Sequence, residues 1–180
     1  MNKHFEFVPG DEKVIAPGRT VKRIRALVAI AALGVVPGDL GGYIETPENL
    51  SGDAWVYGDA RVYGDARVYG NARVSGDARV YGDARVYGNA RVYGDACVSG
   101  NAWVSGNDDQ LTIGPAKSSG RYTTAHRDEK IGVRVNCGCF SGTVLEFSRQ
   151  IEKTHARNKE HLEQYRLFCQ LIASNFGVQP

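Results

Sequence analysis

The chain has 180 residues, and its composition is ordinary apart from 22 glycines. Its 22 basic and 20 acidic side chains are spread evenly, so no third of the chain has a strong charge of one sign. This balance argues against a protein that binds nucleic acid through its phosphates, because such proteins present a basic surface.

The N-terminal region predicts neither an export signal nor a membrane anchor. Its first residues lack an apolar core. The longest apolar run, from Ala26 to Val36, has 11 residues, whereas roughly 20 are needed to span a bilayer. Four cysteines without a secretory signal are typical of reduced thiols. We therefore expect a protein in the cytoplasm of a bacterial host, without a membrane partner.

Residues 1–49 predict a β cap. The segment from Val21 to Val28 suggests a strand, and the segment from Pro37 to Ile44 suggests a turn that leads into the next region. Ile44 already holds the position of an aliphatic residue in the repeat that follows.

Residues 50–107 repeat every six residues, with the consensus Val-Tyr-Gly-Asp-Ala-Arg. This period fits neither an α-helix nor one continuous strand. It fits a short strand and a corner: Val points inward, Arg and Tyr point outward, Gly-Asp turns the chain, and Ala fills the narrow corner. Three such sides close a coil of 18 residues, so the region predicts three stacked coils.

The repeat resembles that of the hexapeptide-repeat proteins, which implies a left-handed β-helix; a right-handed β-helix of the bactofilin type is the structural alternative. Arg25-Ala-Leu, the later Gly-Asp-Leu-Gly-Gly-Tyr-Ile and Asn49-Leu-Ser-Gly-Asp-Ala-Trp-Val look like a leader seen in phage and prophage proteins of this kind. The resemblance implies a mobile-element origin and carries no established activity.

Residues 18 positions apart should stack on one face of the β-helix. Two faces then carry ladders of Arg and Tyr, which give way to Cys97 and Trp103 in the third coil. We expect Trp103 and Cys97 to lie under the C-terminal segment and Trp55 under the N-terminal one. The ladders are either a solvated surface or a binding interface, in which Arg and Tyr are enriched. The candidate binding residues are Arg61, Tyr63, Arg67, Tyr69, Arg79, Tyr81, Arg85 and Tyr87.

The corners carry further columns. Asp59, Asp77 and Asp95 should stack and repel one another unless basic side chains or a cation offset them, and we favour neighbouring arginines. Asn71, Asn89 and Asn107 form a second, neutral column.

Hexapeptide-repeat acyltransferases and carbonic anhydrases need histidine as a general base or as metal ligands. The chain has no His between His4 and His126, and no long loop interrupts the repeats. We therefore expect no enzymatic activity, no catalytic residue, no metal and no cofactor. An acyltransferase-like enzyme is the alternative.

Residues 108–180 leave the period and predict an α+β module. Residues 111–115, 121–126 and 131–135 suggest short strands. Thr143 and Glu146 have the spacing of a capping box, and a second helix is predicted from about Asn158 to Ala173.

The candidate residues in this module are Arg121 and His126. Arg121 follows a loop of Gly114, Ser118, Ser119 and Gly120 that would suit either an anion or no ligand. Cys137 and Cys139 should lie on one face of an extended chain as structural thiols, since their spacing misses that of a zinc site.

The sequence therefore predicts a mainly β protein: a three-coil left-handed β-helix with an N-terminal cap and a small C-terminal α+β module. The favoured function is that of a non-enzymatic binding or assembly protein of phage or prophage type. Its β-helix would form a dimer or trimer, and its C-terminal module would bind a host protein or a small anionic ligand. Inhibition of a host defence system would suit that origin, and a self-assembling structural protein is a further alternative.

Overall fold

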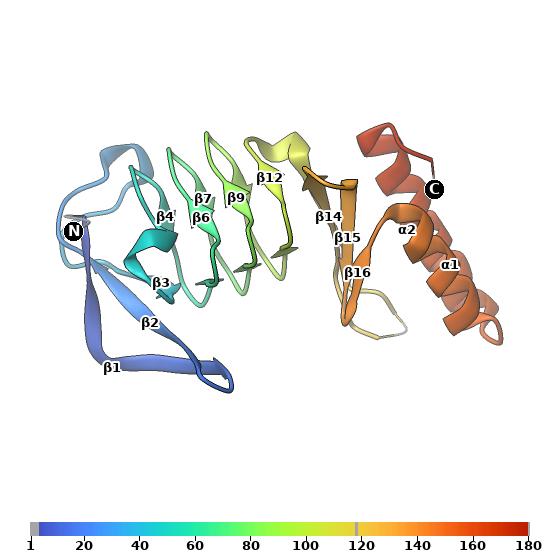
Figure 1. Ribbon diagram of the computed structural model, residues 1–180, viewed down its shortest axis with the longest axis horizontal. Helices are drawn as coiled ribbons and strands as arrows, with labels where there is room; N and C mark the ends of the chain where they lie inside the picture. Colours follow the sequence, from blue (N-terminus) through green and yellow to red (C-terminus); the bar gives the residue numbers. More distant parts are fainter. Residues whose placement is uncertain (1–3, 118, 180) are drawn as a thin grey trace.

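The computed structural model describes residues 4–117 and 119–179. The molecule is elongated: a β-hairpin, a solenoid, a small sheet and a pair of helices follow one another along its length (Figure 1). The predicted fold class, a mainly β chain with a three-turn solenoid and an α+β C-terminal region, is confirmed. In the described part of the chain, neither helix is long and apolar enough to cross a membrane.

The N-terminal region extends one sheet of the solenoid. Strands β1 (Phe5–Ala16) and β2 (Arg19–Ala26) form an antiparallel hairpin, and β3 (Leu40–Ile44) pairs antiparallel with β2. On its other side β3 pairs parallel with the first strand of that solenoid sheet, with Ile44 opposite Val62. The predicted position of Ile44 in the repeat is confirmed.

Two details of this region differ from the prediction. Strand β1 was not predicted, and residues 40–44 form a strand where a turn was expected. The glycines of β3 allow close packing and do not turn the chain. A Cβ atom on Gly41 would lie 2.5 Å from Cγ1 of Ile24, and one on Gly42 would lie 2.6 Å from Cγ1 of Val56. Composition alone suggested a turn because glycine serves both purposes.

The solenoid consists of short parallel strands in three columns, and residues 18 positions apart are paired as predicted, for example Arg61 with Arg79. Each of these strands has two residues. Short 3-10 helices lie in the flanking segments at Ala31–Leu33, Pro47–Asn49 and Asn107–Asp109. The strands are β4 (Trp55–Val56), β5 (Arg61–Val62), β6 (Arg67–Val68), β7 (Arg73–Val74), β8 (Arg79–Val80), β9 (Arg85–Val86), β10 (Arg91–Val92), β11 (Cys97–Val98) and β12 (Trp103–Val104).

The predicted role of each repeat position is also confirmed. The valines of the nine strands are 0% exposed and form one core with the corner alanines. The repeat glycines from Gly52 to Gly100 have φ between +61° and +73°, which a side chain would strain. Gly76 shows a second requirement, because a Cβ atom there would lie 2.9 Å from the backbone nitrogen of Gly94 in the next coil. The left-handed sense of the coil stays a prediction from the repeat.

The C-terminal region is an antiparallel sheet with two helices. The sheet order is β13 (Gln110–Ile113), β14 (Thr123–Asp128), β15 (Gly132–Cys137) and β16 (Phe140–Gly142). Helix α1 (Val144–His155) has the predicted capping box: Thr143 Oγ1 accepts from the Glu146 N–H at 3.2 Å, and Glu146 Oε2 accepts from the Thr143 N–H at 2.8 Å. Helix α2 (Lys159–Phe176) begins close to the predicted start, with Asn158 as its N-cap, and ends at Phe176, beyond the predicted Ala173.

The prediction for Cys137 and Cys139 was wrong. Strand β15 ends at Cys137, and Gly138 and Cys139 form the hairpin turn to β16. Gly138 has a φ of +60°, so the chain reverses between the two thiols instead of continuing as a strand. Cys139 is consequently exposed.

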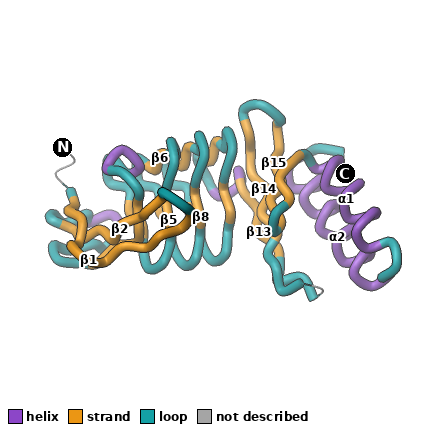
Figure 2. The backbone as a smooth tube through the Cα atoms, turned by 60° about the horizontal axis from the view of Figure 1, so that its bottom comes forward, coloured by secondary structure: helices purple, strands orange, loops and turns teal. Residues whose placement is uncertain are grey.

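The C-terminal sheet stands between the end of the solenoid and the two helices (Figure 2). One of its faces packs on the helices through Val135, Phe147 and Ile172, in a cluster separate from the solenoid core. Its other face meets the last coil, where Asp128 forms an isolated antiparallel bridge with Ala102. The sheet therefore covers the open end of the solenoid.

Of the three residues predicted to lie under the flanking segments, two are covered and one is exposed. Trp55 is 1% exposed and belongs to a core cluster that also contains Ile30 and Val35 of the N-terminal region, as expected. Cys97 lies beneath the C-terminal sheet, since its N–H donates to Thr124 Oγ1 at 3.0 Å. Trp103 is 50% exposed, which contradicts the prediction. The sheet covers the end of the coil, whereas Trp103 projects from its side.

Candidate binding cleft at the end of the solenoid

A buried polar network joins the last coil to the C-terminal sheet. Asn136 Nδ2 lies 2.9 Å from the Cys97 carbonyl oxygen, 3.1 Å from Ser99 Oγ and 3.1 Å from His126 Nε2. The Ser99 N–H donates to the same His126 nitrogen at 3.3 Å. With Nε2 acting as an acceptor, Nδ1 carries the proton and donates to the Arg127 carbonyl oxygen at 3.1 Å. The network fixes the sheet on the solenoid.

His126 is 0% exposed, and both of its ring nitrogens are used by the protein. Burial lowers the pKa of His126 from 6.5 to about 4, because a charged ring would lose its hydration. This residue, a candidate binding residue in the sequence, lies behind the surface and serves to join the sheet to the solenoid.

The pKa of His126 predicts that stability depends on pH. Between about pH 6.5 and pH 4 the unfolded chain binds a proton at His126 that the native state does not. The free energy of unfolding should therefore decrease by about 3 kcal/mol as the pH is lowered through this range. Urea unfolding at pH 7 and pH 4.5 measures this loss. A His126→Gln variant should lose less stability on acidification than the wild type. The control His161→Gln, at the partly exposed start of α2, should retain the wild-type dependence.

A second contact holds the same junction. The enclosed carboxylate of Asp128 accepts from Arg134 Nε at 2.7 Å and from the N–H groups of Lys130 and Ile131. Burial opposes ionisation of Asp128, but these hydrogen bonds outweigh it and lower its pKa. Arg134 also packs on Gly100 of the solenoid, where a Cβ atom would lie 2.6 Å from the guanidinium Nε.

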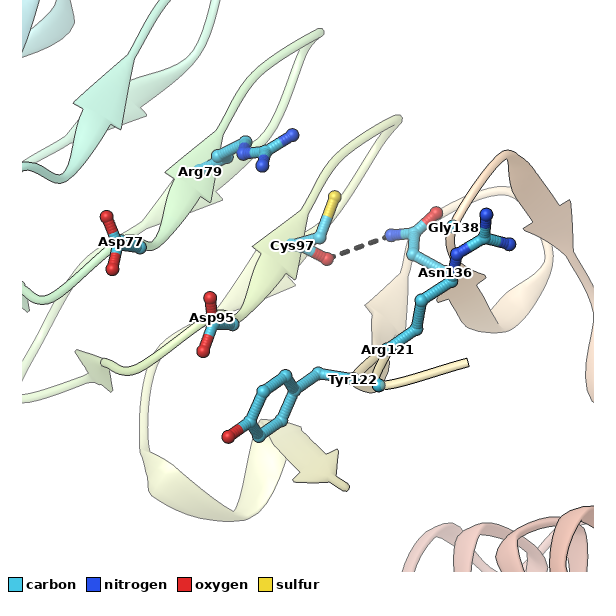
Figure 3. A pocket seen from close by; sticks show the side chains of 9 residues that line it. Asp77, Arg79, Asp95, Cys97, Arg121, Tyr122, Asn136 and Gly138 are labelled. Carbon is cyan, nitrogen blue, oxygen red and sulfur yellow. Dashed lines mark hydrogen bonds between the residues drawn. The ribbon is translucent and has the colours of Figure 1, made fainter. Parts of the chain in front are cut away.

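Beside this junction lies an open cleft of about 330 Å³. One wall comes from the second and third coils, and the other comes from residues 120–122 before β14, from β15 and from the turn between β15 and β16. Figure 3 shows Asp77 and Asp95 in successive coils, Arg79 above Cys97, and Arg121 and Tyr122 on the opposite side. The lining residues are Asp77, Arg79, Asp95, Cys97, Gly120, Arg121, Tyr122, Asn136 and Gly138.

The charged side chains of the cleft have no partners of their own. Within residues 4–117 and 119–179, the side chains of Asp77, Arg79, Asp95 and Arg121 form neither an ion pair nor a hydrogen bond. Asp59, the first member of the same acidic column, differs because Lys13 of β1 forms an ion pair with it and Arg23 lies 3.9 Å away. The N-terminal hairpin thus offsets one end of the column and leaves the other end open.

A backbone detail positions Arg121. Its guanidinium lies against Gly138, where a Cβ atom would come within 2.8 Å of Nη1. The turn between Cys137 and Cys139 thus leaves room for the Arg121 side chain, because Gly138 has no side chain of its own. Ser118, part of the loop considered as an anion site in the sequence, lies outside the described residues.

The thiol in the cleft is not activated. Cys97 Sγ lies 3.4 Å from the Tyr81 hydroxyl oxygen, to which it donates. Burial raises the pKa of Cys97, and burial together with the thiol contact raises the pKa of Tyr81 to about 12. Both groups therefore stay protonated at neutral pH, and neither is prepared to act as a nucleophile or base.

The structure separates the predicted binding residues into groups. Arg79 and Arg121 meet in the cleft, with Tyr81 beside it. Tyr63 stacks on Tyr81 at 5.0 Å between ring centroids and lies beneath Arg19 of the N-terminal hairpin, and Arg61 pairs with Arg79 in the same column of strands. A different face of the solenoid carries Arg67, Tyr69, Arg85 and Tyr87.

Two residues of the cleft were not identified from the sequence. Asn136 is a buried polar residue next to Val135 in an apolar strand, and this exception was a usable signal. Tyr122, the residue before β14, gave no such signal. No group of three or more His, Cys, Asp or Glu side chains that could hold a metal ion occurs among the described residues.

Comparison with known proteins concerns the repeat alone. Residues 54–68, 66–82, 78–94, 84–98 and 90–106 match the family model described as the YdcK beta solenoid repeat. No curated protein and no solved structure matches the chain. The centre of the chain is thus similar to the YdcK beta solenoid repeat, and the cleft lies where that repeat meets the C-terminal sheet.

Proposed function

We propose that this is a non-enzymatic binding protein whose solenoid is a rigid scaffold and whose cleft holds a small anionic ligand. The observation that carries the proposal is the set of four charged side chains that line the cleft without partners among the described residues. A ligand site orients its ligand through a small number of polar or charged groups that converge on a concave surface. The cleft volume of about 330 Å³ suits a molecule at the small end of the usual range.

The charges favour a particular ligand chemistry. Arg79 and Arg121 suit a phosphate or carboxylate, because a guanidinium offers several N–H donors in one plane. Asp77 and Asp95 offset that positive charge, so a simple polyanion gains little. They accept hydrogen bonds from hydroxyl or amino groups. A ligand with one anionic end and several donors, such as a nucleotide or a sugar phosphate, fits both sets.

A binding role is supported over catalysis by the state of the reactive groups. His126 accepts hydrogen bonds in the interior, and the Cys97 thiol stays protonated. An acyltransferase would need a basic group that can reach its acceptor. The alternative enzyme therefore has less support from the residues around the cleft.

The leader-like segment in residues 25–56 favours a phage or prophage origin, and with it a ligand from the host. Sequestering a nucleotide signal of a host defence system would combine this origin with the chemistry of the cleft. This part of the proposal rests on the resemblance and on the ligand class together.

Calorimetric titration with adenosine monophosphate tests the proposal. The wild type should bind this probe more tightly than inorganic phosphate, which lacks donors for Asp77 and Asp95. It should also bind the probe more tightly than adenosine, which lacks the phosphate for Arg79 and Arg121. Arg121→Ala and Arg79→Ala should each weaken binding about tenfold or more, since a hydrogen bond to a charged group contributes about 1.5–3 kcal/mol. Arg91→Ala is the matched control, since Arg91 lies in the repeat but outside the cleft.

Three results would contradict the proposal: no binding of the nucleotide by the wild type, equal binding by the Arg121→Ala variant, or chemical turnover of the bound molecule. Acetyl transfer from acetyl-coenzyme A by the pure protein would instead support the acyltransferase alternative.

A further inference from the structure

The three faces of the solenoid are not equally covered by the chain. On the face of β4, β7 and β10, Arg73 donates to the Ala32 carbonyl oxygen at 2.9 Å, and the Tyr57 hydroxyl donates to that of Leu33 at 3.1 Å. The face of β5, β8 and β11 is continued by the hairpin sheet at one end and borders the cleft at the other. The third face, made by β6, β9 and β12, is the most open: Arg67, Arg85 and Trp103 are exposed, and Arg85 forms a partly solvated ion pair with Glu129 of the C-terminal sheet at 3.5 Å.

An aromatic row runs along this third face. The rings of Tyr69 and Tyr87 are parallel to within 7° with centroids 5.1 Å apart. Trp103 is paired with Arg85 in the arginine column, and its ring reaches Tyr87 at 6.1 Å and 24°, which extends the row. Arg67 and Arg85 stand beside the row in paired register. Trp103 remains 50% exposed, and an exposed tryptophan in a continuous aromatic row is characteristic of an interface.

The pattern of this face is self-complementary in one orientation. Consider a second copy packed face to face about a two-fold axis parallel to the solenoid axis. The strand direction is then reversed while each coil keeps its height, so the arginine column of one copy faces the tyrosine column of the other. Arg67 faces Tyr69 of the other copy, and Arg85 faces Tyr87, both as cation–π pairs.

The corners beside this face agree with the same orientation. Asp65 and Asp83 precede the two arginines, whereas Asn71 and Asn89 follow the two tyrosines. The reversal of strand direction places each Asp opposite an Asn, which can donate to it. With the two-fold axis along the strands, Arg would face Arg and Asp would face Asp, which is repulsive.

We propose that the face formed by β6, β9 and β12 is a homodimer interface with its two-fold axis parallel to the solenoid axis. The occupant is a second copy of this chain, and closed two-fold symmetry is the commonest form of assembly for soluble homo-oligomers. This surface is separate from the cleft, so the dimer and the ligand site can each fail without the other.

Sedimentation equilibrium of paired variants at Tyr87 tests the orientation. The wild type should be a dimer at about 10 µM, within the usual affinity range of specific interfaces. Tyr87→Arg places a guanidinium opposite Arg85 of the other copy and should shift the protein to monomer. Tyr87→Glu places a carboxylate there and should keep the dimer. Tyr93→Arg, on another face at a site that is 63% exposed, is the control and should remain dimeric.

Circular dichroism of each variant establishes whether it is folded. If Tyr87→Arg does not fold, the retained dimer of Tyr87→Glu still tests the proposal. A monomeric or trimeric wild type would overturn the proposal. The same oligomeric state for Tyr87→Arg and Tyr87→Glu would also overturn the proposal. In the other two-fold orientation residue 87 faces the tyrosine column of the second copy, so the sign of its charge would make no difference. Dissociation by Tyr93→Arg would place the interface on another face.

Discussion

Replacement of Asn136 by alanine is expected to lower the free energy of unfolding by about 3 kcal/mol or more, because it removes the side-chain donor from the Cys97 carbonyl and the Ser99 hydroxyl and leaves His126 Nε2 with the Ser99 N–H alone. The Asn136 amide lies between the Cys97 carbonyl, Ser99 and His126, and its side chain has little access to water. The junction between the solenoid and the C-terminal sheet should therefore weaken.

Urea unfolding followed by far-ultraviolet circular dichroism measures this change, since α1 and α2 lie beyond the junction. The matched control is Asn175→Ala, at an exposed position of α2 away from the junction and from the proposed interface. The control should change stability by less than about 0.5 kcal/mol. Equal unfolding midpoints for the two variants would show that the polar network contributes nothing specific.

Replacement of Ala84 by leucine should be more damaging still. Ala84 is 0% exposed at a corner of the solenoid, and its carbonyl oxygen accepts from Arg67 N–H at 2.8 Å in the neighbouring coil. Overpacking a core costs about 1–3 kcal/mol where the surroundings can move. Here the stacked coils fix the backbone on both sides, so we expect a loss above about 3 kcal/mol, or no folded solenoid.

Thermal unfolding and limited proteolysis distinguish these two outcomes. Asp53→Ala, at an equivalent exposed corner outside the proposed interface and the cleft, is the control and should leave the melting temperature almost unchanged. A leucine variant as stable as the wild type would mean that the corner has free space, contrary to the close packing of the alanines.

The repeat could be read from the sequence because each of its positions has one physical role, which recurs every six residues. Val62 is inside, Arg61 is outside and Gly64 turns with a positive φ, and the same holds in each coil. A helix start was equally predictable at Thr143, where a local capping box is sufficient. These features depend on neighbours in the sequence or on the period.

The remaining features depend on contacts between distant segments. Gly41 and Gly42 suggested a turn, but Ile24 and Val56 come too close to permit a side chain there. Trp103 was expected to be covered, and only the direction of approach of the sheet leaves it exposed.

The cleft depends on distant contacts in the same way. Arg79 and Arg121 were each candidates in the sequence, but no local pattern indicated that they would meet. His126 became part of the interior for the same reason, since the sheet closes over it when it docks on the last coil.

Native mass spectrometry of the protein purified from bacterial cells tests the central claim most directly, when adenosine monophosphate is added and an Arg79→Ala/Arg121→Ala double variant is measured beside the wild type. The account predicts one nucleotide-sized adduct per chain on the wild type and none on the double variant, with the oligomeric state unchanged. The same adduct on both proteins, or none on the wild type in the presence of the nucleotide, would contradict the assignment of the cleft as the binding site.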